Sequence, residues 1–61
     1  MLNTEYIKSM REFLIEKGTF TIPYLKYSIK NTKNHKFLSA ADKDMLISCY
    51  NILLEELGGN I

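Results

Sequence analysis

The segment that most constrains the fold is residues 40–57, an apolar-rich stretch with a helix start signal before it and a helix stop signal after it. Ser39 belongs to the residues that cap helix N-termini, and Gly58-Gly59 is typical of a helix end. Apolar side chains cover about two-thirds of the helical wheel of this segment, whereas an amphipathic helix usually shows a stripe of about 100°. The segment is therefore predicted to be the central helix of a bundle and to present a ridge to another molecule.

The predicted ridge consists of Ile47, Tyr50 and Leu54, which follow one another at three- and four-residue spacing. Tyrosine is amphipathic and enriched in binding surfaces, so Tyr50 is the best candidate for an anchor residue. Packing of Tyr50 inside the same chain, with its hydroxyl in water, remains an equal alternative.

Two shorter helices precede this segment. The first of them has one apolar stripe at helical spacing, which consists of Tyr6, Ile7, Met10, Phe13 and Leu14. Gly18 follows Lys17 and suits the left-handed conformation that ends many helices. Pro23 favours the first turn of the next helix. The sequence predicts an all-α fold, a small three-helix bundle in a single domain (1–61), with helices at about 5–17, 23–32 and 40–57.

The small size of the chain limits how it can be stabilised. With 61 residues and one Cys it cannot form an internal disulfide, and one Cys with one His does not predict a zinc site. We therefore expect no metal and no cofactor, and we expect a partner surface, including a homodimer, to supply further stability.

No catalytic constellation is recognisable, so we do not expect an enzyme. Cys49 lies in the apolar arc without a His within one turn. Asp42 and Asp44 are two residues apart on a helix and point about 200° from each other, so they suit the helix start better than acid–base chemistry. His35 is predicted to be a solvated loop residue.

The middle of the chain is basic, because residues 17–41 contain five lysines and no acidic residue. Like charges at i, i+4 destabilise a helix slightly, so the stability of the helix does not explain this row of lysines. Three interpretations stay open: a solvated face paired with acids such as Glu55 and Glu56, contact with an acidic protein, or contact with nucleic acid, where tyrosines would stack on bases. The residues concerned are Lys26, Lys30, Lys33 and Lys36. Tyr24 and Tyr27 lie nearby and are predicted, together with the ridge, to bind another protein.

Compartment signals are few. No apolar stretch approaches the about 18 residues of a membrane span, and charges interrupt each apolar run near Met1 before a signal peptide could form. An unpaired Cys suits a reducing compartment. We expect a cytoplasmic protein without a membrane partner.

Two segments resemble the AbbA-type antirepressors in the spacing of their hydrophobic residues. These segments are Phe20-Thr-Ile-Pro-Tyr-Leu-Lys-Tyr-Ser-Ile29 and Leu46-Ile-Ser-Cys-Tyr50, which cover about half the chain with a one-residue gap. Members of that family are small helical proteins of Gram-positive bacteria that block a DNA-binding regulator by imitating DNA with acidic side chains. The middle of this chain is basic, so the resemblance does not extend to DNA mimicry.

A second pattern, Asp44-x-Leu-Ile-x-x-Tyr50 with Met10-Arg11 and Leu14 upstream, looks like part of the signature of small aspartyl-phosphate phosphatases that act on sporulation response regulators. That family has Ser-Gln before its Leu-Asp, whereas this chain has Ala40-Ala-Asp-Lys43. Of the functional residues of that family, only the aspartate has a counterpart in this chain, and this counterpart is Asp44.

Both resemblances imply a tiny bacterial or phage regulator. The leading hypothesis is a non-enzymatic regulatory or inhibitory protein that binds another protein through the predicted ridge and the lysine-rich helix. The alternatives are a nucleic-acid-binding module that uses the segment 26–36 and a response-regulator phosphatase that uses Asp44.

Overall fold

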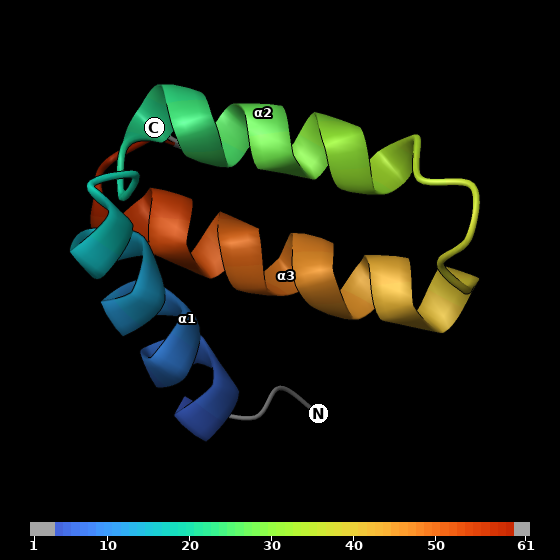
Figure 1. The fold of residues 1–61 in the computed structure, drawn as a ribbon, viewed down its shortest axis with the longest axis horizontal. Helices are drawn as coiled ribbons and strands as arrows, with labels where there is room; N and C mark the ends of the chain where they lie inside the picture. Colours follow the sequence, from blue (N-terminus) through green and yellow to red (C-terminus); the bar gives the residue numbers. More distant parts are fainter. Residues whose placement is uncertain (1–3, 60–61) are drawn as a thin grey trace.

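A computed structural model describes residues 4–59 and shows three α-helices and no strand among them (Figure 1). The helices are α1 (Thr4–Lys17), α2 (Ile22–Lys33) and α3 (Ala40–Glu56). The predicted all-α three-helix fold is confirmed, and the helix ends that differ from prediction are shifted by one residue. No helix in the described range combines the length and the apolar character needed to span a membrane.

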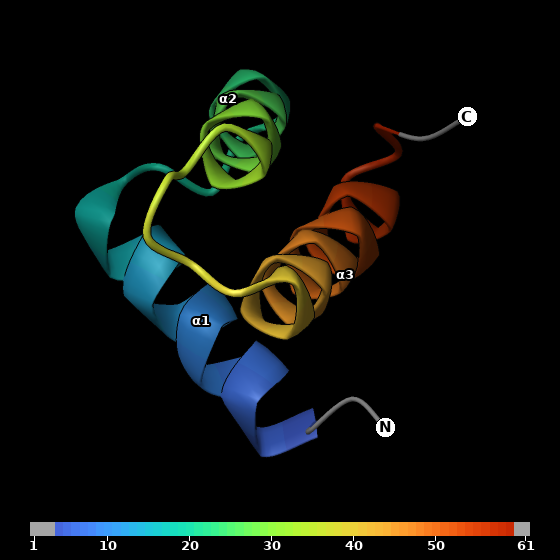
Figure 2. The same cartoon turned by 90° about the vertical axis from the view of Figure 1, so that its right-hand side faces the viewer.

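The helix α3 is the central element of the fold. α2 runs antiparallel along α3, and α1 crosses α3 at an angle (Figures 1 and 2). No Cα atom of α1 comes within 8 Å of a Cα atom of α2. The two shorter helices therefore lie closer to α3 than to each other.

The two later helices begin at side-chain caps. The Thr21 hydroxyl oxygen accepts a hydrogen bond from the Tyr24 backbone N–H at 3.4 Å, and Pro23 occupies the first turn of α2. The Ser39 hydroxyl oxygen accepts from the Asp42 backbone N–H at 3.1 Å, as predicted for the start of α3. Each cap satisfies a backbone donor that has no partner inside the helix.

The end of α1 is fixed by a glycine. Gly18 has a φ of +72°, which an L side chain rarely adopts. Its N–H donates to the Ile15 carbonyl at 3.0 Å, and the Thr19 N–H donates to the Leu14 carbonyl at 2.9 Å. This is the Schellman motif, and it turns the chain sharply from α1 toward α2.

The end of α3 repeats the same motif. Gly58 has a φ of +79° and donates to the Glu55 carbonyl at 3.0 Å, while the Gly59 N–H donates to the Leu54 carbonyl at 2.8 Å. The predicted stop at Gly58-Gly59 is confirmed, with Leu57 as the C-cap residue.

The core takes half of its buried hydrophobic residues from α3 and the other half from α1 and α2. Leu25 of α2 and Leu53 of α3 have no exposed surface, and Cys49 is a buried free thiol. Leu54 is only 2% exposed, so its predicted place on a surface ridge is wrong. The C-terminal turn folds back over Leu54, and a Cβ on Gly59 would lie 2.6 Å from the Leu54 Cδ2 atom. The buried hydrophobic residues are Ile7, Leu14, Leu25, Cys49, Leu53 and Leu54.

Candidate functional site: a groove between α1 and α2

The candidate site is a groove of about 350 Å³ to which all three helices contribute. It exists because α1 and α2 lie apart and leave part of α3 uncovered between them. None of its lining residues is charged. We call it the tyrosine groove; it is lined by Tyr6, Ser9, Met10, Phe13 and Leu14 from α1, Tyr24 from α2, and Leu46 and Tyr50 from α3.

Several aromatic rings of the tyrosine groove are open to solvent. Phe13 is 57% exposed, and Tyr6 and Tyr24 are each 39% exposed. The Lys17 ammonium group lies 5.6 Å from the centre of the Phe13 ring, within cation–π range. Contiguous exposed apolar surface of this kind is typical of interaction sites in small soluble proteins.

Tyr50 is half-buried and lines the groove. Burial raises the pKa of its phenol, the nearby phenols of Tyr24 and Tyr6 raise it further, and a side-chain hydrogen bond with Ser28 lowers it. Ser28 is itself buried on α2. Tyr50 packs against the core and also lines the groove.

The raised pKa of Tyr50 leads to a prediction. We expect its phenol to ionise above the usual value of 10.0, because the charged form is disfavoured in the fold. The folded state then binds this proton more tightly than the unfolded state, so the contribution to stability is complete below pH 10 and is lost as the pH rises through the folded-state pKa. In an ultraviolet titration, we expect one tyrosine to ionise above pH 10, and this step should be absent in Tyr50→Phe. If the step persists unchanged in Tyr50→Phe, the raised pKa does not belong to Tyr50.

The predicted ridge does not form one surface. Ile47 is half-buried and lies outside the groove lining, and Leu54 is in the core, so only Tyr50 of the three reaches the groove. The place of Phe13 on the groove wall does not follow from the sequence, because its helical spacing with the core residues of 5–17 assigns it to the interior. In the structure Phe13 is 57% exposed.

Tyr27 extends the aromatic surface beyond the groove. It is 60% exposed, and its ring centroid lies 6.5 Å from that of Tyr24 in a tilted arrangement. The aromatic surface therefore continues from the groove onto the outer face of α2, where Tyr24 and Tyr27 remain the predicted protein-binding residues.

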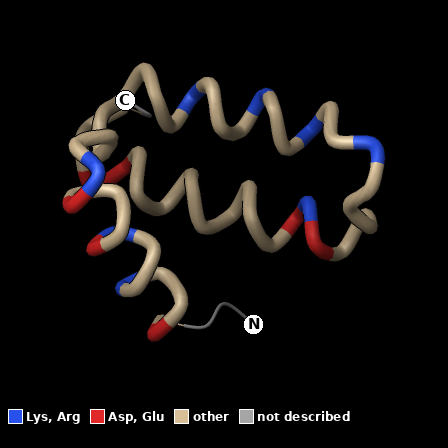
Figure 3. Tube along the Cα trace, in the orientation of Figure 1, with Lys and Arg blue, Asp and Glu red and all other residues tan. Residues whose placement is uncertain are grey.

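The lysines of the middle segment follow α2 and the loop after it (Figure 3). Among residues 4–59 an ion pair joins Arg11 to Glu56, and none joins a lysine of the row to an acidic residue. The expected pairing of the row with Glu55, Glu56 or the aspartates is therefore not found in this range. The exposed lysines are Lys26, Lys30, Lys33 and Lys36, and the Lys43 ammonium group donates to the Lys33 carbonyl at 3.4 Å.

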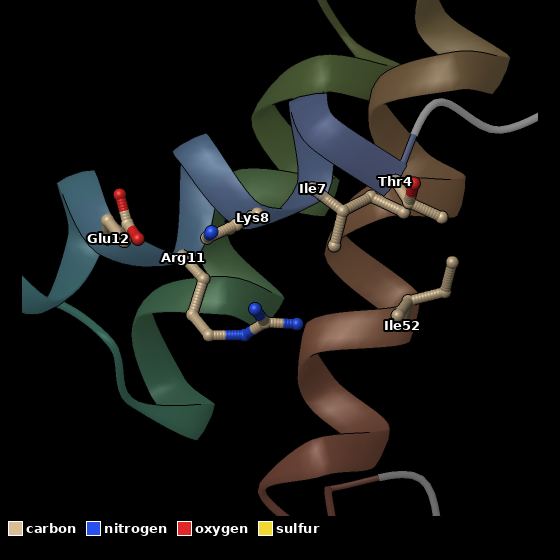
Figure 4. Close-up of a pocket in the computed structure, with 6 residues that line it drawn as sticks. All are labelled: Thr4, Ile7, Lys8, Arg11, Glu12 and Ile52. Carbon is tan, nitrogen blue, oxygen red and sulfur yellow. The ribbon is translucent and has the colours of Figure 1, made fainter.

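A second hollow lies between α1 and α3, with a volume of about 570 Å³ (Figure 4). Arg11 reaches from α1 toward α3 and binds Glu56 through two hydrogen bonds of 2.8 and 2.5 Å. This interaction is the main reason that the pKa of Arg11 is raised. The charged groups of Arg11 and Glu56 pair with each other. We interpret this ion pair as an interaction that stabilises the packing of α1 against the C-terminal end of α3. The lining residues are Thr4, Ile7, Lys8, Arg11, Glu12 and Ile52.

The reactive side chains lie apart from both hollows. Burial raises the pKa of the Cys49 thiol, which disfavours the nucleophilic thiolate. Asp42 and Asp44 are exposed near the start of α3, and the His35 Nδ1 atom accepts a hydrogen bond from the Phe37 N–H at 3.1 Å. Within residues 4–59, no group of three or more His, Cys, Asp or Glu side chains is placed to hold a metal ion.

Comparisons with known proteins found no matching family model, no similar curated protein and no similar solved structure. The function proposed for this chain therefore rests on its own geometry and chemistry.

Proposed function

We propose that this protein is a small non-enzymatic regulator that binds another protein through the tyrosine groove. The observation that carries the proposal is the set of exposed aromatic rings around an uncharged groove, with Phe13, Tyr6 and Tyr24 on its walls. Tyrosine and other aromatic residues dominate the binding energy of protein interfaces, because they bury a large area and lose little conformational freedom.

The extent of the aromatic surface favours a protein over a small ligand. The groove volume of about 350 Å³ is near the lower limit of small-molecule sites, about 300–1,000 Å³. Tyr27 continues the apolar surface outside the groove along α2. A partner that covers both the groove and Tyr27 buries more of this surface than a ligand confined to the groove.

The chain offers a matched pair of variants to test this proposal. Phe13 and Ile15 both lie on α1 and are both 57% exposed, but only Phe13 lines the groove. We expect Phe13→Ser to weaken binding to a purified partner by about ten-fold or more, as at an interface hot spot, and Ile15→Ser to change it by less than about two-fold. Because both side chains are exposed, neither change should unfold the protein.

The measurement requires a defined partner. Proteins captured from the native cells by the tagged wild-type chain would be identified, purified and titrated by calorimetry against wild type, Phe13→Ser and Ile15→Ser. Equal affinities for the two variants would refute the proposal. Sedimentation of the same three proteins tests the homodimer, which should dissociate in Phe13→Ser if a second copy occupies the groove.

A further inference from the structure

We infer that a second copy of this chain covers the tyrosine groove until the partner protein displaces it. In this dimer α1 of each copy packs on α2 of the other, about a two-fold axis that runs along the groove. The displacement by a partner rests on the proposed function, whereas the dimer rests on the charges and the exposed area of the two groove walls.

The outer edges of the two walls carry charges of opposite sign. Glu16 follows the exposed ring of Phe13 by three residues on α1, and Lys30 follows the exposed ring of Tyr27 by three residues on α2. Residues three apart in sequence lie about 60° apart around a helix, so each charged side chain borders the ring on its own helix. Glu16 and Lys30 are both exposed, and neither has an ion pair within residues 4–59.

The neighbouring charges preserve this difference between the walls. Glu5 lies within about 20° of Glu16 around α1, and Lys26 lies within about 40° of Lys30 around α2, which contains no acidic residue. Lys17 is the exception, because its ammonium group lies 5.6 Å from the centre of the Phe13 ring. The remaining charged residues of α1 line the second hollow instead. The α1 wall is therefore negative on balance, and the α2 wall is positive.

These opposite edges make the surface complementary to itself. In a two-fold symmetric dimer every contact occurs twice, with the roles of the two copies exchanged. An axis along the groove places the negative edge of α1 opposite the positive edge of α2 at both contacts. An axis across the groove would instead place α1 on α1 and α2 on α2, so that like charges meet. The floor adds no repulsion, because α3 has no charged residue between Asp44 and Glu55.

The exposed rings supply apolar area for such a contact. Each of the four rings of the groove and its extension is 39–60% exposed, and an aromatic side chain offers about 150–250 Å², so together they present roughly 300–500 Å² per copy. A standard interface buries about 800 Å² from each partner, so the rings fill about half of one and the dimer is expected to be weak. The rings are those of Tyr6, Phe13, Tyr24 and Tyr27.

The size of the chain favours this use of the groove. A domain of 61 residues obtains little stability from its own core, and the single Cys excludes an internal disulfide. Burial of the rings against a second copy adds apolar burial without a new structural element. Because the second copy and the partner use the same surface, the apparent affinity for the partner falls once the chain concentration exceeds the dimer dissociation constant.

Sedimentation at low salt, from micromolar to millimolar chain concentrations, measures the dimer. We expect a reversible equilibrium between monomer and dimer that Phe13→Ser weakens by about ten-fold or more and Ile15→Ser by less than about two-fold. Added salt should also weaken it, because the charged edges are exposed. Circular dichroism confirms that each variant is folded before it is compared.

Charge reversal tests the pairing of α1 with α2. Glu5→Lys/Glu16→Lys makes both edges positive, and Lys26→Glu/Lys30→Glu makes both edges negative, so each variant alone should dimerise about ten-fold more weakly than the wild type. An equimolar mixture of the two restores opposite charges at both contacts and should recover about the wild-type affinity as a heterodimer.

A third variant controls for net charge. Asp44→Lys/Glu55→Lys has the same net charge as Glu5→Lys/Glu16→Lys, but its two positions are exposed on α3 outside the groove lining. This variant should dimerise like the wild type, and it should not replace Glu5→Lys/Glu16→Lys in the mixture. Recovery with both partners alike would mean that net charge alone drives association, which refutes the arrangement.

The other outcomes separate the dimer from the proposed function. A chain that stays monomeric up to millimolar concentration, or a dimer that Phe13→Ser leaves intact, refutes the inference; the proposed function still stands if Phe13→Ser weakens binding of the native partner. A dimer that Phe13→Ser dissociates, together with unchanged partner binding by this variant, supports the dimer and refutes the proposed function. Equal apparent partner affinity below and above the dimer dissociation constant refutes displacement.

Discussion

Leu53→Ala is expected to lower the free energy of unfolding by about 2–5 kcal/mol, the cost of removing a buried leucine side chain and leaving a cavity. Leu53 has no exposed surface and lies on the central helix α3, against which both other helices pack. A domain of this size rarely has more than about 3–5 kcal/mol of stability from its core alone. We therefore expect much of the variant to be unfolded at room temperature.

Circular dichroism during urea and thermal unfolding measures this effect. Ile15→Ala is the control, because Ile15 is an exposed aliphatic residue and its truncation should change stability by no more than about 0.5 kcal/mol. A Leu53→Ala variant that unfolds together with the wild type would mean that Leu53 is not at the centre of the core.

The second large effect is expected for Gly59→Ala. The new Cβ atom would lie 2.6 Å from the Leu54 Cδ2 atom and 3.4 Å from two carbon atoms of Ile22. Leu54 is only 2% exposed, so its side chain has little room to move. Overpacking of this kind costs about 1–3 kcal/mol, measured as a lower urea midpoint.

A double-mutant cycle separates this clash from any effect on the backbone. Leu54→Ala removes the Cδ2 atom that the new methyl group would meet, so Gly59→Ala should cost much less in that background than in the wild type. An equal cost in both backgrounds would show that the glycine is required for another reason. Gly18→Ala is a useful contrast, because Gly18 has a positive φ but its new Cβ atom would meet no other atom within 4 Å.

The helices could be predicted from the sequence because their signals are local. Ser39 and Gly18 act on the backbone within a few residues, and Pro23 restricts its own φ. The effect of each of these residues on the helix ends therefore does not depend on tertiary packing. The helix boundaries therefore agree with prediction to within one residue.

The site depends on information that a helical wheel does not contain. The apolar arc of α3 is too wide for a simple amphipathic helix, but the wheel does not show which part of the arc faces α2. It therefore puts Leu54 on a surface ridge, although the C-terminal turn covers this residue. It also puts Phe13 on the apolar stripe of its helix, although Phe13 is 57% exposed in the structure. Tyr24 and Tyr50 are recognisable as candidates from the sequence, but not as neighbours.

The distribution of charge has a consequence for how this protein approaches other molecules. Acidic and basic side chains are mixed along α1, acidic residues predominate at the two ends of α3, and lysines follow α2, although the net charge is only +1 (Figure 3). Such a separation gives the molecule an electric dipole moment. In the field of a negatively charged macromolecule the protein rotates during diffusion so that α2 leads, and the fraction of productive collisions then depends on ionic strength.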